Sequence, residues 1–75
     1  MQLGTRWSVG EAPPASLPAP VTEAVRGVEA ELDEIDTSGW RWTLTWLENR
    51  PVVELDDGTT IRLDASGDTT VTPAP

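Results

Sequence analysis

The spacing of apolar residues changes once along this chain, and that change constrains the fold more than any other feature. Between positions 17 and 35, apolar residues recur three or four positions apart, which predicts a helix with one apolar stripe. From position 40 onward, apolar and polar residues alternate, which is typical of strands buried on one face. Such a chain buries both apolar surfaces by packing the helix on the sheet. The sequence therefore predicts a two-layer α+β sandwich.

The helix is expected to span Pro18–Ile35. Ser16 is the predicted N-cap, because its hydroxyl can accept a hydrogen bond from a free N–H of the first turn. The helix is expected to stop near 37–39, where Gly39 can adopt a left-handed turn. The proline-rich stretch 10–17 is expected to be an extended crossover. The predicted stripe consists of Leu17, Val21, Ala24, Val25, Val28, Leu32 and Ile35.

Loop lengths in the second half predict how the strands pair. A three-residue loop at Asp56–Gly58 sets Val53 opposite Ile61, which keeps apolar residues together. A two-residue turn would set Val53 opposite Arg62 and mix core with solvent. The loop Ala65–Gly67 repeats the same chemistry before a weak last strand. The apolar face of the sheet is expected to consist of Trp40, Trp42, Leu44, Trp46, Val53, Leu55, Ile61, Leu63 and Val71.

The first strand and the first turn leave alternatives open. Residues 2–9 alternate, with Leu3, Trp7 and Val9 on the apolar side. A right-handed crossover would set this strand parallel to a neighbour, and antiparallel pairing with an edge strand is equally open. The turn after the tryptophan-rich strand uses Asn49 together with either neighbour.

The complete prediction is one helix packed on an antiparallel sheet of four or five strands. The element order is β-α-β-β-β, with a further strand at the end as an option. One domain is expected to cover residues 1–72, and residues 73–75 are expected to form a frayed tail.

The four tryptophans are expected to serve mainly as core residues. A small chain needs bulky core side chains to offset its conformational entropy. Trp42 and Trp46 are the predicted core pair, whereas the exposure of Trp7 and Trp40, nearer strand ends, is left open. The alternative is a stacking platform for sugars, prolines or bases.

Composition excludes several classes of site. The chain has no cysteine, histidine or lysine, which excludes disulfides, Cys or His ligation of zinc or haem, iron–sulfur clusters, Ser-His-Asp triads and Schiff-base lysines. The acidic loops at 56–57 and 64–68 lack the alternating ligands of a calcium loop. We therefore expect no enzyme activity, no cofactor and no metal ion.

Charge limits the classes of partner. Thirteen acidic and five basic residues give a net charge of −8, which repels a phosphate backbone and an anionic membrane surface. No apolar run approaches the roughly 20 residues that span a bilayer. We expect a cytoplasmic chain whose partner is neither a nucleic acid nor a membrane.

The open face of the predicted sheet, opposite the helix, is the first candidate interaction surface. It carries three of the five arginines, while acids gather elsewhere. These residues form either solvated cross-strand ladders or a contact surface for a protein or a second copy. The candidates are Arg6, Arg41, Thr43, Thr45, Glu54 and Arg62.

The acidic end of the predicted helix is the second candidate surface. Its acids crowd the last two turns, where the negative end of the helix dipole disfavours them. They form either a solvated face or a docking surface for a basic partner. The candidates are Glu29, Asp33, Glu34 and Asp36.

Two segments carry a resemblance to other chains. The stretch 39–48, GWRWTLTWLE, running into 52–59, VVELDDGT, together with the start LGTRW at 3–7, resembles small uncharacterised acidic proteins of high-GC actinobacteria. The resemblance implies no activity or site. The function expected from the residues is a non-catalytic protein–protein interaction or accessory module, acting on a protein partner or as a homodimer. The alternative is an acidic inhibitor or nucleic-acid mimic that captures a basic partner through its helix.

Overall fold

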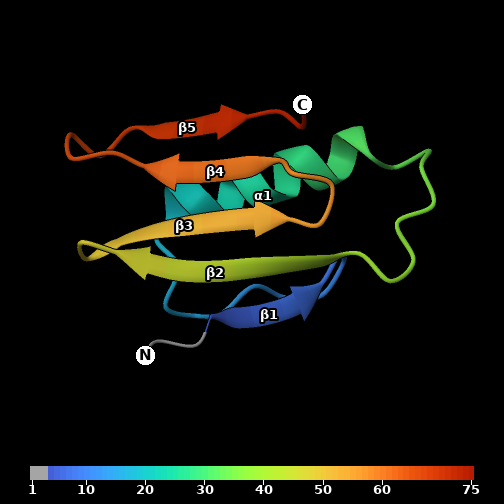
Figure 1. Ribbon diagram of the computed structural model, residues 1–75, viewed down its shortest axis with the longest axis horizontal. Helices are drawn as coiled ribbons and strands as arrows, with labels where there is room; N and C mark the ends of the chain where they lie inside the picture. The colour runs from blue at the N-terminus through green and yellow to red at the C-terminus, as the bar shows by residue number, and fades with distance from the viewer. Residues whose placement is uncertain (1–3) are drawn as a thin grey trace.

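The computed structural model describes residues 4–75 and shows one helix packed on one face of a five-stranded sheet (Figure 1). This confirms the predicted α+β class and element order, and the optional last strand is present. The predicted position of Leu3 lies outside the described residues. The elements are β1 (Thr5–Ser8), α1 (Ala19–Glu31), β2 (Arg41–Leu47), β3 (Arg50–Leu55), β4 (Thr60–Leu63) and β5 (Thr69–Thr72).

The sheet follows chain order, β1-β2-β3-β4-β5, and every neighbouring pair is antiparallel. The question left open for the first strand is thereby settled: β1 lies at one edge, with Trp7 opposite Trp42. The chain then crosses behind the sheet as 10–17 and enters α1 (Figure 1). The edges of the sheet are therefore β1 and β5.

The strand register agrees with the loop-length argument. Val53 lies opposite Ile61, and Leu63 lies opposite Thr69. The glycines of the two three-residue loops have φ of 104° and 90°, a conformation that glycine adopts without steric cost. The turn between β2 and β3, for which two positions were open, is formed by Glu48 and Asn49. Their φ values of 52° and 65° are typical of a two-residue type I′ turn.

The core lies between the helical stripe and the adjacent face of the sheet. The rings of Trp7 and Trp42 stack, with centroids 6.3 Å apart. Trp46, expected in the core, is only half-buried, as is Trp40. Val71 lies on the same face but is 45% exposed, because β5 is the edge strand. The buried apolar residues are Trp7, Leu17, Val21, Val25, Val28, Trp42, Leu44, Val53, Leu55 and Ile61.

The helix is shorter than the periodicity predicts, and both expected ends are wrong. It starts at Ala19 after Pro18, which makes no side-chain capping bond, so Ser16 is not the N-cap. It ends at Glu31, and Ile35, the last member of the predicted stripe, is 50% exposed. Three acids follow within five residues, at the negative end of the helix dipole where further helical turns are disfavoured.

Candidate functional site

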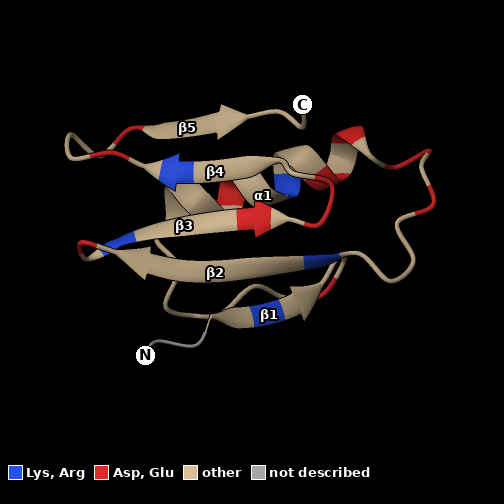
Figure 2. Cartoon of the chain, viewed as in Figure 1, with Lys and Arg blue, Asp and Glu red and all other residues tan. Residues whose placement is uncertain are grey.

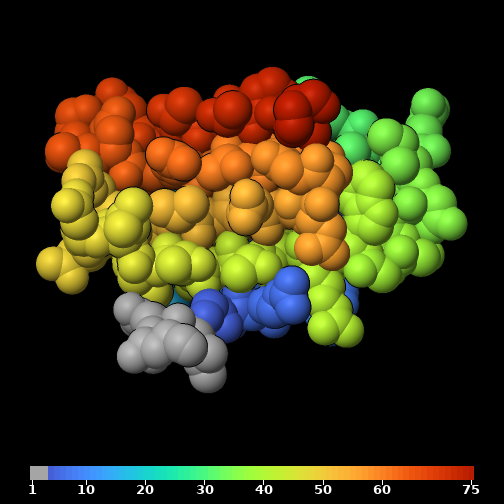
Figure 3. Space-filling model, viewed as in Figure 1, coloured from blue at the N-terminus to red at the C-terminus, as the bar shows by residue number. Residues whose placement is uncertain are grey.

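The open face of the sheet brings the predicted interaction residues into two cross-strand rows. Strand pairing aligns each row across the sheet. Figure 3 shows this face, with the strands as successive bands of colour from β1 to β5. Arg41 is on the same face at the start of β2, opposite Ser8. The first row is Arg6, Thr43, Glu54, Thr60 and Thr72, and the second row is Thr45, Val52, Arg62 and Thr70.

The arginines of this face have few partners within the chain. Arg6 Nε donates to Thr43 Oγ1 at 3.2 Å. Within residues 4–75, one ion pair is present, between Arg50 Nη2 and Glu48 Oε2 at 3.1 Å, and both of its side chains are exposed. Arg26 lies on α1 and the other four arginines lie on strands, whereas most acidic segments lie in loops and turns (Figure 2). Arg6, Arg41 and Arg62 therefore keep guanidinium donors for a ligand.

A shallow depression of about 370 Å³ opens on this face beside the hairpin of β2 and β3. Its floor and walls combine apolar carbon with guanidinium groups and hydroxyls. Leu47, at its rim, is 61% exposed. The depression is lined by Leu47, Arg50, Val52, Arg62, Leu63, Asp64, Thr70 and Thr72.

Of the eight lining residues, Arg62 alone is among the six predicted candidates, and Leu47 and Arg50 are two of those that the prediction missed. They form the pair next to the Glu48-Asn49 turn. Strand alternation places Leu47 on the open face with Thr45, and the choice of turn decides that Arg50 lies opposite it. The signal for Leu47 was the alternation of Thr43 and Thr45. The signal for its pairing with Arg50 was the turn chemistry, because both central residues of a type I′ turn need positive φ, which asparagine tolerates.

The predicted acidic helix face does not form as expected. Only Glu29 belongs to α1; Asp33, Glu34 and Asp36 lie in the segment after it. The last of these accepts a hydrogen bond from Ser38 N at 3.0 Å, and its bonds to Ser38 hold the pKa of Asp36 below the ordinary value.

Glu29 has a structural task. Its Oε2 accepts a hydrogen bond from Trp42 Nε1 at 2.9 Å and another from Gly10 N at 3.1 Å. One carboxylate oxygen thus joins the helix, the buried indole of β2 and the loop after β1. Sequence periodicity cannot reveal this contact, because it joins positions far apart in the chain.

The acidic loops are also occupied by local bonds. Asp64 Oδ1 accepts from Asp68 N at 2.9 Å, from Ser66 Oγ at 2.8 Å and from Ser66 N at 3.0 Å. These hydrogen bonds, of which the one from Asp68 N has the largest effect, hold the pKa of Asp64 below its ordinary value. From position 4 onward, no group of three or more acidic side chains is placed to hold a metal ion.

The open face can therefore bind through donors and an apolar floor. Arginine forks pair in a bidentate manner with carboxylates, and threonine hydroxyls both donate and accept. In the described part of the chain, no helix is long and apolar enough to span a bilayer. Searches of protein-family models, curated proteins and solved structures found no match for this chain.

Proposed function

We propose that the chain is a non-catalytic interaction module that binds a protein partner through its open sheet face. The observation that carries the proposal is the depression between Arg50 and Arg62, with exposed Leu47 at its rim. The chain has a net charge of −8, yet this depression is lined by two arginines and apolar side chains. Its charge therefore differs from that of the chain as a whole.

The chemistry of this surface specifies the partner segment. Arg62, which makes no ion pair within residues 4–75, favours a carboxylate, because a guanidinium pairs with both of its oxygens. Val52 and Leu47 favour a neighbouring apolar side chain. Among the described residues, the face carries no aromatic side chain on which a base could stack, so a protein segment with an acid beside an apolar residue fits it best.

The non-catalytic part of the proposal depends on the acids near the depression. Asp64 is the one carboxylate in its lining, and its Oδ1 already accepts three hydrogen bonds from its own loop. General acid–base chemistry needs a group placed on the substrate with a pKa near the working pH. A carboxylate with a lowered pKa is a poor candidate.

The test compares two arginine variants with equal change in charge. Arg62→Glu alters the open face, and Arg26→Glu alters an exposed position of the helix. Proteins captured from lysate by the wild-type chain are expected to be lost with Arg62→Glu, and with Arg41→Glu/Arg62→Glu, but kept with Arg26→Glu. Capture and sedimentation behaviour unchanged in the double variant would remove the open face from consideration.

The second candidate function is capture of a basic partner by the acids that follow the helix. The observation in its favour is that Glu31, Asp33, Glu34 and Asp36 are all exposed within six residues. Salt separates the two candidates, since contacts between exposed charges weaken as ionic strength rises. A partner released by salt and insensitive to Arg62→Glu would favour this second candidate.

A further inference from the structure

The two edges of the sheet differ in the state of their backbone groups. The bond from Val9 N to Trp40 O shows that alternate residues of the first strand, Thr5, Trp7 and Val9, face β2. Ser8 therefore directs its backbone groups outward. Glu11 forms hydrogen bonds with both of these groups: its Oε1 accepts one from Ser8 N at 2.9 Å, and its own N–H donates one to Ser8 O at 3.0 Å. The β1 edge is thus capped at Ser8, and within β1 only Arg6 still directs its backbone groups away from β2.

The β5 edge is open. The bond from Asp64 N to Asp68 O sets the pattern of the β4–β5 ladder, so Thr70 faces β4 while Thr69 and Val71 direct N–H and C=O away from the sheet. No hydrogen bond among the described residues reaches these outward groups. Proline at position 73 has no N–H, which ends the run of free donors.

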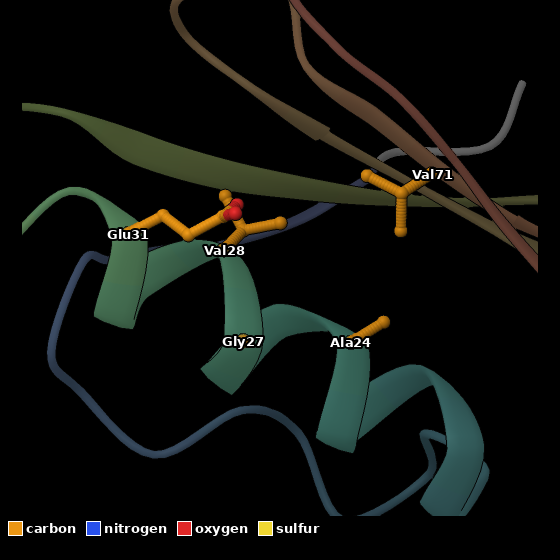
Figure 4. A pocket seen from close by; sticks show the side chains of 5 residues that line it. All are labelled: Ala24, Gly27, Val28, Glu31 and Val71. Carbon is orange, nitrogen blue, oxygen red and sulfur yellow. The ribbon is translucent and has the colours of Figure 1, made fainter.

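An apolar groove of about 330 Å³ lies beneath this edge, between β5 and α1. Figure 4 shows the side chain of Val71 pointing from the strand toward the helix, with Ala24 below it. A Cβ on Gly27 would meet nothing within 4 Å. On the same strand, Thr69 Oγ1 is buried without a hydrogen-bond partner. The groove is lined by Ala24, Gly27, Val28, Glu31 and Val71.

We propose that a second copy of the chain binds this edge, with the two β5 strands antiparallel about a two-fold axis at Thr70. Thr69 then lies opposite Val71 of the second copy, and the reverse pair forms by symmetry. Each pair exchanges both N–H···O=C bonds. All the outward groups of Thr69 and Val71 are satisfied at once, and the sheets join into one.

Charge and symmetry favour a second copy over an unrelated strand. Residues 69–75 have no charged side chain, so two chains of net charge −8 meet without like-charged side chains in the strand contact. The dyad also sets Val71 of each copy over the groove region, beside the small residues Ala24 and Gly27. This edge is separate from the open sheet face, so the inference does not depend on the proposed function.

Cysteine cross-linking tests the register directly, because the chain has no cysteine of its own. In the proposed dimer, Thr70 lies opposite Thr70 of the second copy, and the two form a non-hydrogen-bonded pair. Their Cα atoms are then about 4.5 Å apart, a spacing that a disulfide can bridge. Thr72, on the same strand and face, lies opposite Asp68 of the second copy. Thr70→Cys is expected to oxidise to a linked dimer about tenfold faster than Thr72→Cys, reflecting effective concentration across a formed pair. Equal rates would overturn the register.

Association and amide exchange test the dimer without a cross-link. Sedimentation from about 10 µM to about 1 mM is expected to show weak dimerisation that strengthens with salt, since screening reduces the repulsion between two acidic chains. Val71→Lys is expected to abolish it, whereas Thr45→Lys, with the same change in charge on the open face, keeps it. Amides of Thr69 and Val71 gain protection with concentration, and that of Thr70 does not.

Three outcomes overturn the proposal. A monomeric wild-type chain at high salt and the highest concentration removes the dimer. Dimerisation that survives Val71→Lys places the contact elsewhere. Protection of Thr69 and Val71 that appears only on adding another protein, with the free chain monomeric, assigns the edge to a foreign strand.

Discussion

Glu29 joins three parts of the fold through one oxygen, so its replacement is the sharpest test of the packing. Glu29→Ala removes the acceptor of Trp42 Nε1, and Trp42 is fully buried. Within the intact fold the indole has no exposure to solvent, so Glu29 is its hydrogen-bond partner. The same change removes the bond from Gly10 N, which lies in an exposed loop.

The magnitude follows from three effects. A buried donor left without a partner costs about 1–3 kcal/mol, and a typical exposed hydrogen bond contributes about 0.5–1.5 kcal/mol. Removing a negative charge from the last turn of α1 recovers about 0.3–1 kcal/mol from the helix dipole. We expect Glu29→Ala to lower the free energy of unfolding by about 2 kcal/mol, or Tm by about 10 °C for a domain of this size. Glu29→Gln keeps an acceptor oxygen and is expected to lose less than about 1 kcal/mol.

Urea unfolding, followed by fluorescence and far-ultraviolet circular dichroism, measures these differences. The decisive control is a double-mutant cycle with Trp42→Phe, which removes the N–H itself, so Glu29→Ala should cost at least about 1 kcal/mol less in that background. Glu31→Ala, an exposed change in the same turn, is expected to stay within about 0.5 kcal/mol of wild type. An unchanged cost of Glu29→Ala in the Trp42→Phe background would refute the reasoning.

Three further predictions concern glycines and a loop carboxylate. Gly27→Ala is expected to stabilise the fold by about 1 kcal/mol, measured by urea unfolding, because a Cβ at this exposed helical position meets nothing within 4 Å. Gly58→Ala should destabilise more than Gly67→Ala in the same assay: both have positive φ, but only the first would bring a Cβ to within 3.0 Å of the C-terminal tail. Ser66→Ala is expected to raise the pKa of Asp64 in an NMR titration, by removing a bond to its carboxylate. Because the pKa of Asp64 is lowered in the folded state, ionised Asp64 adds to the free energy of unfolding at pH values above its ordinary pKa of 3.8. That contribution is lost as the pH falls through the pKa of the folded state.

The antiparallel pairing of β2, β3, β4 and β5 is predictable from the sequence, because a few residues in each connecting loop determine the register of each hairpin. Shifting Val53 by one position would exchange the core and solvent faces of a whole strand, so the three-residue loop is strongly specified. Strand alternation and loop length together are enough to place Arg62 and Thr43 on the open face, where strand pairing finds them. The candidate site is predictable from the sequence to that extent.

Long-range contacts explain what the pattern could not predict. The pairing of Trp7 with Trp42 joins positions 35 apart in sequence, and no turn between them sets its direction. The apolar spacing that continues to Ile35 carries no mark of where hydrogen bonding stops, so the helix end depends on the acids beyond Glu31. The pairing of Leu47 with Arg50 depends on the choice between two adjacent turns, whereas strand alternation alone sets the face of Leu47.

The structure also changes which charges are available for function. An acid cluster on a helix suggests a docking face, yet Glu29, the one candidate that is truly helical, is bonded to the core. The arginines show the opposite case, because Arg62 lies beside apolar Val52 with no ion pair in the described part of the chain. Surface charges already bonded within a fold must break those bonds before they contact a partner, whereas unpaired ones need only lose water. That difference gives the open sheet face priority over the acids of α1.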